Sequence, residues 1–173
     1  MIRPPHFAAI LAITLACVFP AGFTVAQDAP TVDEQMDGLV QMCADTEQAR
    51  AERHAAKPLF ERLGGYDRVH ELTTEIIRLH TINPDFDRFM GDVDGEELAT
   101  SVADFISTGT GGPDVYLGRD MRSAHAHLEL SDADFLSAGS DVTKAMHNIG
   151  YGEDEVQEMI CILVSMKDLV ITR

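Results

Sequence analysis

The sequence predicts an all-α domain, and three observations lead to this prediction. From Pro58 to the C-terminus, apolar residues recur at the three- and four-residue spacing of helices that bury one face. No segment alternates apolar and polar residues for long enough to indicate a β-strand. Glycine and proline clusters separate the apolar stripes, as expected where helices end. With 173 residues, the chain can bury one sizeable core but not two.

Four apolar stripes predict the main helices. One precedes the Asn83-Pro84 stop, one precedes a glycine-rich region, and two follow that region, separated by Gly150 and Gly152. The stripes consist of Val69, Leu72, Ile76 and Leu79; Leu98, Val102, Phe105 and Ile106; Phe135, Ala138, Val142, Met146 and Ile149; and Val156, Ile160, Leu163, Val164 and Val170. The third helix should have a capped start, because Ser131 is followed three residues later by Asp134.

Two shorter segments complete an expected domain of residues 57–173. A short helix from Leu59 to Leu63 should end at Gly64-Gly65. Residues 107–120 contain Gly109, Gly111-Gly112-Pro113 and Gly118, so they can hardly form regular helix. A long glycine-rich connection inside a compact helical domain usually shapes a functional loop.

Residues 1–26 have the layout of a secretory signal peptide. A positive start at Arg3 precedes an uncharged apolar run from Phe7 to Phe19, and small residues end at Ala26, after which we expect cleavage. The apolar run is shorter than the roughly 20 residues that a spanning helix needs. We therefore expect a periplasmic or secreted protein, with no membrane span in the mature chain.

Residues 27–56 form a polar, acidic extension before the domain. Met36, Leu39, Val40 and Cys43 nevertheless fall at helical spacing, which predicts one amphipathic helix in this segment.

The charge balance excludes two classes of partner. The chain has 29 acidic and 13 basic residues, a formal net charge of −16. Such a surface repels phosphate backbones and anionic lipids, so neither nucleic acid nor a membrane surface is an expected partner. The plainer consequence of this charge is solubility.

Two cysteines, Cys43 and Cys161, remain after the expected cleavage. In an oxidising compartment they could form a disulfide between the N-terminal segment and the last long helix, or remain two separate buried thiols. They lack the histidine or cysteine companions of a zinc site.

Among seven histidines, His125 has distinctive neighbours. Met121 precedes it by four residues and Leu128 follows it by three, which gives it an apolar face directly after the glycine-rich loop. A histidine on such a face is more often a core residue than a ligand, and one histidine alone never makes a metal site. Haem is the exception, because the porphyrin supplies four nitrogens and the protein one axial imidazole.

Three segments, in this order and at this spacing, resemble group I truncated haemoglobins from about Pro58 to the C-terminus. They are Leu59-Phe60-Glu61-Arg62-Leu63-Gly64-Gly65, Gly111-Gly112-Pro113-Asp114-Val115-Tyr116-Leu117-Gly118-Arg119-Asp120-Met121, and Ala124-His125-Ala126-His127-Leu128-Glu129-Leu130. The resemblance implies a two-over-two helical sandwich that binds haem b, with the added N-terminal helix outside it. It also implies that His125 is the proximal iron ligand, with its second ring N–H donated to a nearby backbone carbonyl.

The same resemblance implies which side chains surround the haem. Leu98, Val102, Phe105 and Ile106 would face the open side of the iron, together with Ile76 and Ile77, while Tyr116, Met121 and Leu128 would flank the loop and the proximal side. The position of the phenylalanine that commonly wedges the haem falls on Met90, with Phe89 one residue away.

The chain departs from the family on the ligand side. Ile77 stands where many relatives have a tyrosine, and Leu98 and Val102 stand where a polar residue is often found. Without a hydrogen-bond donor, dioxygen should leave quickly, whereas carbon monoxide and nitric oxide depend less on that bond. The ferric iron would then be five-coordinate or would recruit a side chain such as His80.

These observations favour a haem protein that reversibly binds a diatomic gas (O2, CO or NO). One alternative is an enzyme that processes nitric oxide or peroxide, which would need an external electron donor because the chain has no G-x-G-x-x-G nucleotide motif. The other is a globin-like interaction or regulatory module that has lost haem.

Overall fold

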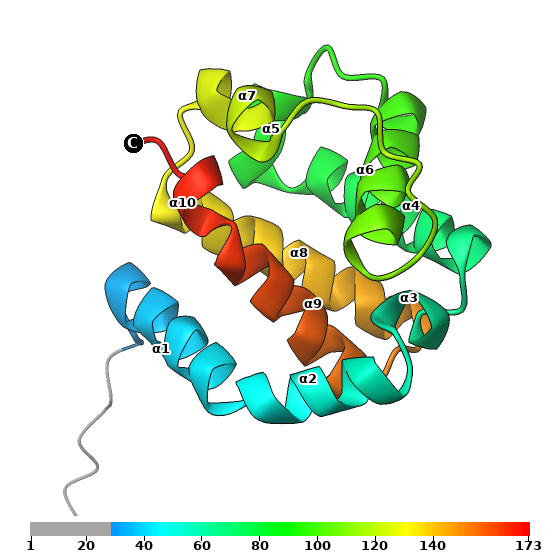
Figure 1. The fold of residues 1–173 in the computed structure, drawn as a ribbon. Helices are drawn as coiled ribbons and strands as arrows, with labels where there is room; N and C mark the ends of the chain where they lie inside the picture. Colours follow the sequence, from blue (N-terminus) through cyan, green and yellow to red (C-terminus); the bar gives the residue numbers. More distant parts are fainter. Residues whose placement is uncertain (1–28) are drawn as a thin grey trace, which may run out of the picture.

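The computed structural model describes residues 29–173, and its regular elements are helices (Figure 1). They are α1 (Val32–Asp45), α2 (Glu47–Ala56), α3 (Leu59–Arg62), α4 (Tyr66–Ile82), the 3-10 turn η1 (Pro84–Phe86), α5 (Asp87–Met90), α6 (Gly95–Gly109), α7 (Met121–His125), the 3-10 turn η2 (Ala126–Leu128), α8 (Asp132–Ile149), α9 (Glu153–Ser165) and α10 (Lys167–Val170). Within residues 29–173, the β-structure is limited to one bridge, between Leu130 and Ile171. The all-α prediction is confirmed.

The expected signal peptide lies outside the described residues. From residue 29 onward, no helix combines the length and the apolar character needed to cross a bilayer.

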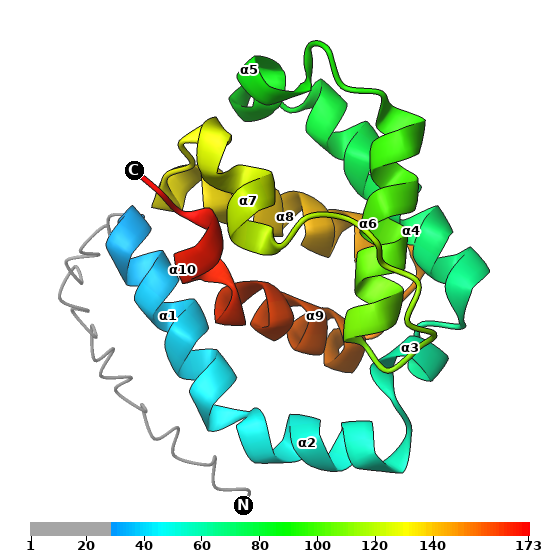
Figure 2. The same ribbon diagram turned by 45° about the horizontal axis from the view of Figure 1, so that its top comes forward.

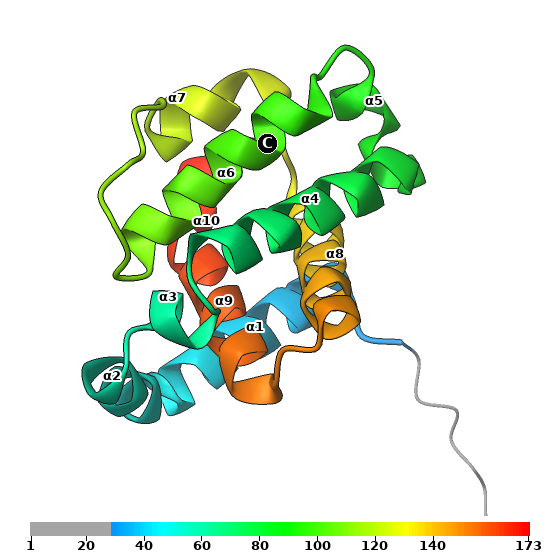
Figure 3. The same cartoon turned by 90° about the vertical axis from the view of Figure 1, so that its right-hand side faces the viewer.

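Two pairs of helices form the body of the domain. α4 packs on α6 and on α8, and α8 packs on α9, so that the α4–α6 pair lies against the α8–α9 pair (Figure 3). The buried core between them includes Leu72 of α4, Met146 of α8 and Met159 of α9, all essentially inaccessible to solvent. Burying side chains of this size stabilises the fold by roughly 1.5 to 3 kcal/mol each.

Local sequence signals set the ends of α8. Ser131 Oγ accepts a hydrogen bond from the Asp134 N–H (3.3 Å), and an Asp134 carboxylate oxygen accepts one from the Ser131 N–H (2.8 Å), which completes the expected capping box. Gly150 ends the helix at φ 94°, a left-handed conformation that favours glycine.

Two expectations about helix limits are wrong. The irregular segment expected at 107–120 begins only after Gly109, because Ser107 is fully buried and continues α6. The single helix expected in residues 27–56 is two helices, broken at Thr46. Thr46 Oγ1 donates to the Met42 carbonyl (2.8 Å) and Arg50 Nη2 to the Cys43 carbonyl (2.6 Å), so side chains satisfy the backbone groups at the end of α1.

A disulfide ties α1 to the body of the domain. α1 lies against α8 and α9, and α2 continues from it toward α3 (Figure 2). Cys43 of α1 is bonded to Cys161 of α9, with 5.4 Å between their Cα atoms. Of the two alternatives left by the sequence, the structure therefore has the disulfide.

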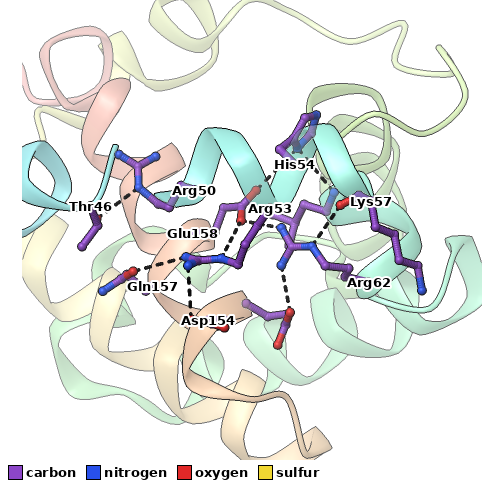
Figure 4. A network of polar contacts seen from close by, with 11 residues as sticks. Thr46, Arg50, Arg53, His54, Lys57, Arg62, Asp154, Gln157 and Glu158 are labelled. Atoms are coloured by element: carbon purple, nitrogen blue, oxygen red, sulfur yellow. Dashed lines mark hydrogen bonds and ion pairs between the residues drawn. The ribbon is translucent and has the colours of Figure 1, made fainter. Parts of the chain in front are cut away.

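A buried carboxylate holds α2 and α3 to α9 (Figure 4). Glu158 of α9 is 4% exposed and pairs with Arg62 of α3. From α2, His54 Nδ1 lies 3.5 Å from Glu158 Oε1, and Arg53 Nε lies 4.0 Å from Glu158 Oε2. The two guanidinium groups beside this buried carboxylate offset much of its desolvation cost.

Candidate functional site

α7 places His125 at its C-terminal end. The helix starts at Asp120, whose carboxylate accepts hydrogen bonds from the Ser123 N–H (2.9 Å) and the Ser123 hydroxyl (2.7 Å). His125 is half-buried, and its Nδ1 lies 2.8 Å from the Met121 carbonyl oxygen one turn earlier. A carbonyl only accepts, so Nδ1 carries the proton and donates it.

This bond leaves the other ring nitrogen of His125 available. Within the described chain, Nε2 has no hydrogen-bond partner. A neutral imidazole fixed through Nδ1–H presents an unprotonated Nε2, which is the form that binds metals. The structure thus contains the carbonyl bond expected for His125.

The segment after His125 is anchored to the C-terminus. Glu129 adopts φ 51° and ψ 50°, a left-handed conformation that reverses the chain after η2. The Leu130 carbonyl then accepts hydrogen bonds from the N–H groups of Thr172 (3.0 Å) and Arg173 (3.2 Å). Hydrogen bonds therefore fix the chain on both sides of α7, through the Asp120 cap before the helix and through the Leu130 carbonyl after it.

α6 buries its small residues and leaves its large apolar ones half-covered. Ala99, Ala103 and Ser107 are inaccessible or nearly so, in keeping with the close packing of α6 on α4. Leu98, Val102 and Phe105, three of the four α6 side chains expected to face a ligand, are only partly buried and lie outside the main core cluster. Ile106, the fourth, packs against that cluster instead. This leaves an incompletely covered apolar face on α6.

Other expected site residues meet this helix. Ile77 of α4 is buried, and its Cγ2 would lie 3.3 Å from a Cβ atom placed at Gly95, the first residue of α6. The Phe105 ring meets the Tyr116 ring edge to face, with centroids 5.2 Å apart. The structure thus brings α4, α6 and the glycine-rich loop together around the α6 face. Ile76 instead belongs to the main core cluster.

The other side chains expected to surround the haem lie less close to one another. Phe89 packs edge to face on Phe86 (5.7 Å between centroids), with the Arg88 guanidinium 4.4 Å from its ring centroid. Met90 ends α5, and Met121 and Leu128 flank His125 along the chain, all three partly buried.

A model of the bacterial-like globin family matches residues 58–171, most of the described chain. The chain belongs to this family. The matched range starts just before α3, so α1 and α2 lie outside it.

Solved truncated haemoglobins resemble this globin in fold. A 2/2 haemoglobin from a Synechococcus species, in the cyanomet state and with covalently attached haem, shares 24% identity over 67% of this chain and 99% of its own, with a TM-score of 0.63. A truncated haemoglobin from Tetrahymena pyriformis in the Fe(III) form shares 18% identity over 68% and 100%, with a TM-score of 0.62. One from Chlamydomonas reinhardtii shares 27% identity over 67% and 96%, with a TM-score of 0.58. No curated protein matches the chain.

The described residues of the globin fit a haem better than a metal held by protein alone. Across residues 29–173, no group of three or more histidine, cysteine or acidic side chains could hold a metal ion. Haem needs one axial nitrogen and an apolar wall, and these are what His125 Nε2 and the α6 face offer.

The sequence did not reveal a buried polar cluster beside α4. His80 Nδ1 lies 3.0 Å from an oxygen of the buried Asp141 carboxylate, and its ring stacks on Phe86 with centroids 4.4 Å apart. Asn83 Nδ2 donates to the same oxygen (2.7 Å). A signal was present, because Asp141 interrupts the apolar stripe of α8 between Ala138 and Val142.

Burial and hydrogen bonding act in opposite directions on the protonation of this pair. Desolvation lowers the pKa of His80, although the Asp141 carboxylate opposes the shift. Desolvation would raise the pKa of Asp141, but hydrogen bonds from Asn83 and His80 prevail and lower it. His80 is thus occupied as a neutral structural partner of Asp141.

Proposed function

We propose that this globin binds haem b, with His125 Nε2 as the axial iron ligand, and that a diatomic gas binds reversibly on the opposite side. The observation that carries the proposal is the fixed His125 ring, with Nδ1 bonded to the Met121 carbonyl and Nε2 unpartnered in the described chain. When bound, haem iron supplies a coordination position for the gas.

The polypeptide would contribute orientation and exclusion of water. The Met121 carbonyl fixes the tautomer of His125 and raises the electron density that its ring can donate. On the other side, Ile77, Leu98 and Val102 provide an apolar wall without a hydrogen-bond donor. This favours carbon monoxide and nitric oxide relative to dioxygen, because bound dioxygen is stabilised most by a donor.

We also propose that the protein is a group I truncated haemoglobin that is exported and cleaved after Ala26. The three sequence motifs support the group. The signal-like N-terminus supports export, and so does the Cys43–Cys161 disulfide, because disulfides persist mainly in oxidising compartments. An external electron donor would then be needed to keep the iron ferrous.

An absorption spectrum of the mature chain tests the cofactor. Residues 27–173 would be titrated with haem and examined in ferric, ferrous and ferrous-carbonyl forms, beside His125→Ala. His127→Ala is the matched control, since this exposed histidine lies two residues away. We expect one haem per chain and a Soret band that is grossly altered only in His125→Ala. A spectrum indifferent to His125 would overturn the ligand assignment, and the absence of stoichiometric uptake would overturn the haem assignment.

A further inference from the structure

A hollow of about 470 Å³ lies between α6 and the glycine-rich loop. Its walls include Asp94, Glu96, Glu97 and Asp104 from α6 and its cap, and Tyr116 and Leu117 from the loop. No basic side chain is among its lining residues in the described chain. Charge of one sign concentrated in a hollow attracts oppositely charged partners more strongly than scattered charge does.

Two of these carboxylates already have partners within the protein, and two face solvent. Asp94 caps α6 by accepting the N–H groups of Glu96 and Glu97 (3.0 Å each), and Asp104 accepts the Tyr66 hydroxyl (2.7 Å). The side chains of Glu96 and Glu97 are exposed at the rim.

An apolar side chain projects from the same rim. Leu117 is 97% exposed, and Val115, two residues before it, is also exposed. The loop holds Leu117 in place through Tyr116, whose N–H donates to Thr108 Oγ1 (3.1 Å) and whose hydroxyl donates to the Arg119 carbonyl (2.7 Å). A Cβ atom at Gly118 would collide with the Tyr116 phenol, so glycine is required for this turn. A leucine fixed in full exposure is typical of a contact surface rather than of a folded interior.

Tyr116 connects the hollow to the proposed haem site. It lines the hollow, and its ring packs against Phe105 on the apolar face of α6. On the helix, Asp94, Ser101 and Asp104 flank the row formed by Leu98, Val102 and Phe105 on one side. A partner seated on the hollow would therefore lie beside the edge of the proposed cofactor.

We propose that this surface, formed by Glu96, Glu97, Val115 and Leu117 around the hollow, docks a basic electron-donating protein that presents an apolar socket for Leu117. The inference rests on the proposed haem function. The acidic hollow is complementary to a basic partner. Since the whole chain has a net charge of −16, charge alone does not select one surface, and the exposed Leu117 gives the contact a defined position. The donor is oxidised by one electron and the ferric iron is reduced to ferrous, with no atom or proton transferred.

Calorimetric titration with cytochrome c, a small basic electron-transfer protein, tests the docking. The protein is measured with and without haem, at low and at physiological ionic strength. The rim variant is Glu96→Gln/Glu97→Gln, and its control is Glu47→Gln/Glu52→Gln on α2, which changes the charge equally. The apolar variant is Leu117→Ser, and its control is Val40→Ser on α1, where the side chain is 41% exposed.

We expect both test variants to weaken binding by about tenfold at low ionic strength and both controls by less than twofold. Equal weakening by the rim variant and its control would show that only overall charge matters and would overturn the proposal. An unchanged affinity for Leu117→Ser would overturn the defined contact. Docking is also measured without haem, so a failure of the proposed haem function is distinguishable from a failure of docking. If the Soret band shows no haem uptake, the electron-transfer role is refuted and the docking result remains valid.

Discussion

Removing the Cys43–Cys161 disulfide should cost a large part of the stability of this protein. The bond joins residues 118 positions apart, so it closes most of the described chain into one loop. In the chain-entropy treatment, a loop of this length removes about 16 cal/mol/K from the unfolded state, or about 4.9 kcal/mol at 25 °C. Domains of this size are stable by only about 5 to 15 kcal/mol, so the bond should be decisive under mild denaturation.

The test is guanidinium unfolding of Cys43→Ala/Cys161→Ala beside the oxidised and the reduced wild-type protein, followed by far-ultraviolet circular dichroism. Alanine keeps the buried Cys161 site apolar, so the main change is loss of the cross-link. We expect the free energy of unfolding to fall by about 3 to 5 kcal/mol in the variant and equally in the reduced protein. Native helicity should remain in water, because the core between α4, α8 and α9 does not depend on the bond. A loss below about 1 kcal/mol would refute the argument from loop closure.

Three further perturbations test other parts of the structure. Ile77→Tyr adds a hydrogen-bond donor to the gas-binding side, so flash photolysis of the haem-loaded protein should show dioxygen leaving about 10 to 100 times more slowly, whereas Ile77→Phe should leave the rate unchanged. The pKa of His80 is lowered in the folded protein, so the unfolded state binds more protons, and the free energy of unfolding should fall as pH drops below about 6.5. Denaturant titrations at several pH values should show this slope flattened in His80→Gln but retained in His147→Gln, where the histidine is exposed; equal slopes in both variants would contradict the assignment. Glu158→Leu removes the buried carboxylate shared by Arg62 and Arg53, although Arg62 keeps Glu155 and Arg53 keeps Asp154 as partners. The free energy of unfolding should therefore fall by about 1 to 3 kcal/mol in thermal denaturation, and a neutral effect would show that the Glu158 ion pairs only balance their desolvation.

Much of the fold could be predicted because its signals are local. Apolar spacing predicted α4, α6, α8 and α9, and the Ser131 capping box and Gly150 marked the ends of α8. The bond from His125 to the Met121 carbonyl also spans a single helical turn, so chain geometry alone brings the two groups together. The family resemblance used the same kind of information, since its motifs are short contiguous segments.

Contacts between distant residues could not be predicted in this way. The sequence determined by itself an all-helical globin domain and the position of its candidate iron ligand. Only the tertiary structure decided that Cys43 reaches Cys161, that Asp141 meets His80, and that acidic side chains of α6 surround a hollow beside Leu117. The physical reason is that helix formation depends on residues three and four positions apart, whereas these pairings depend on how completed helices pack against one another.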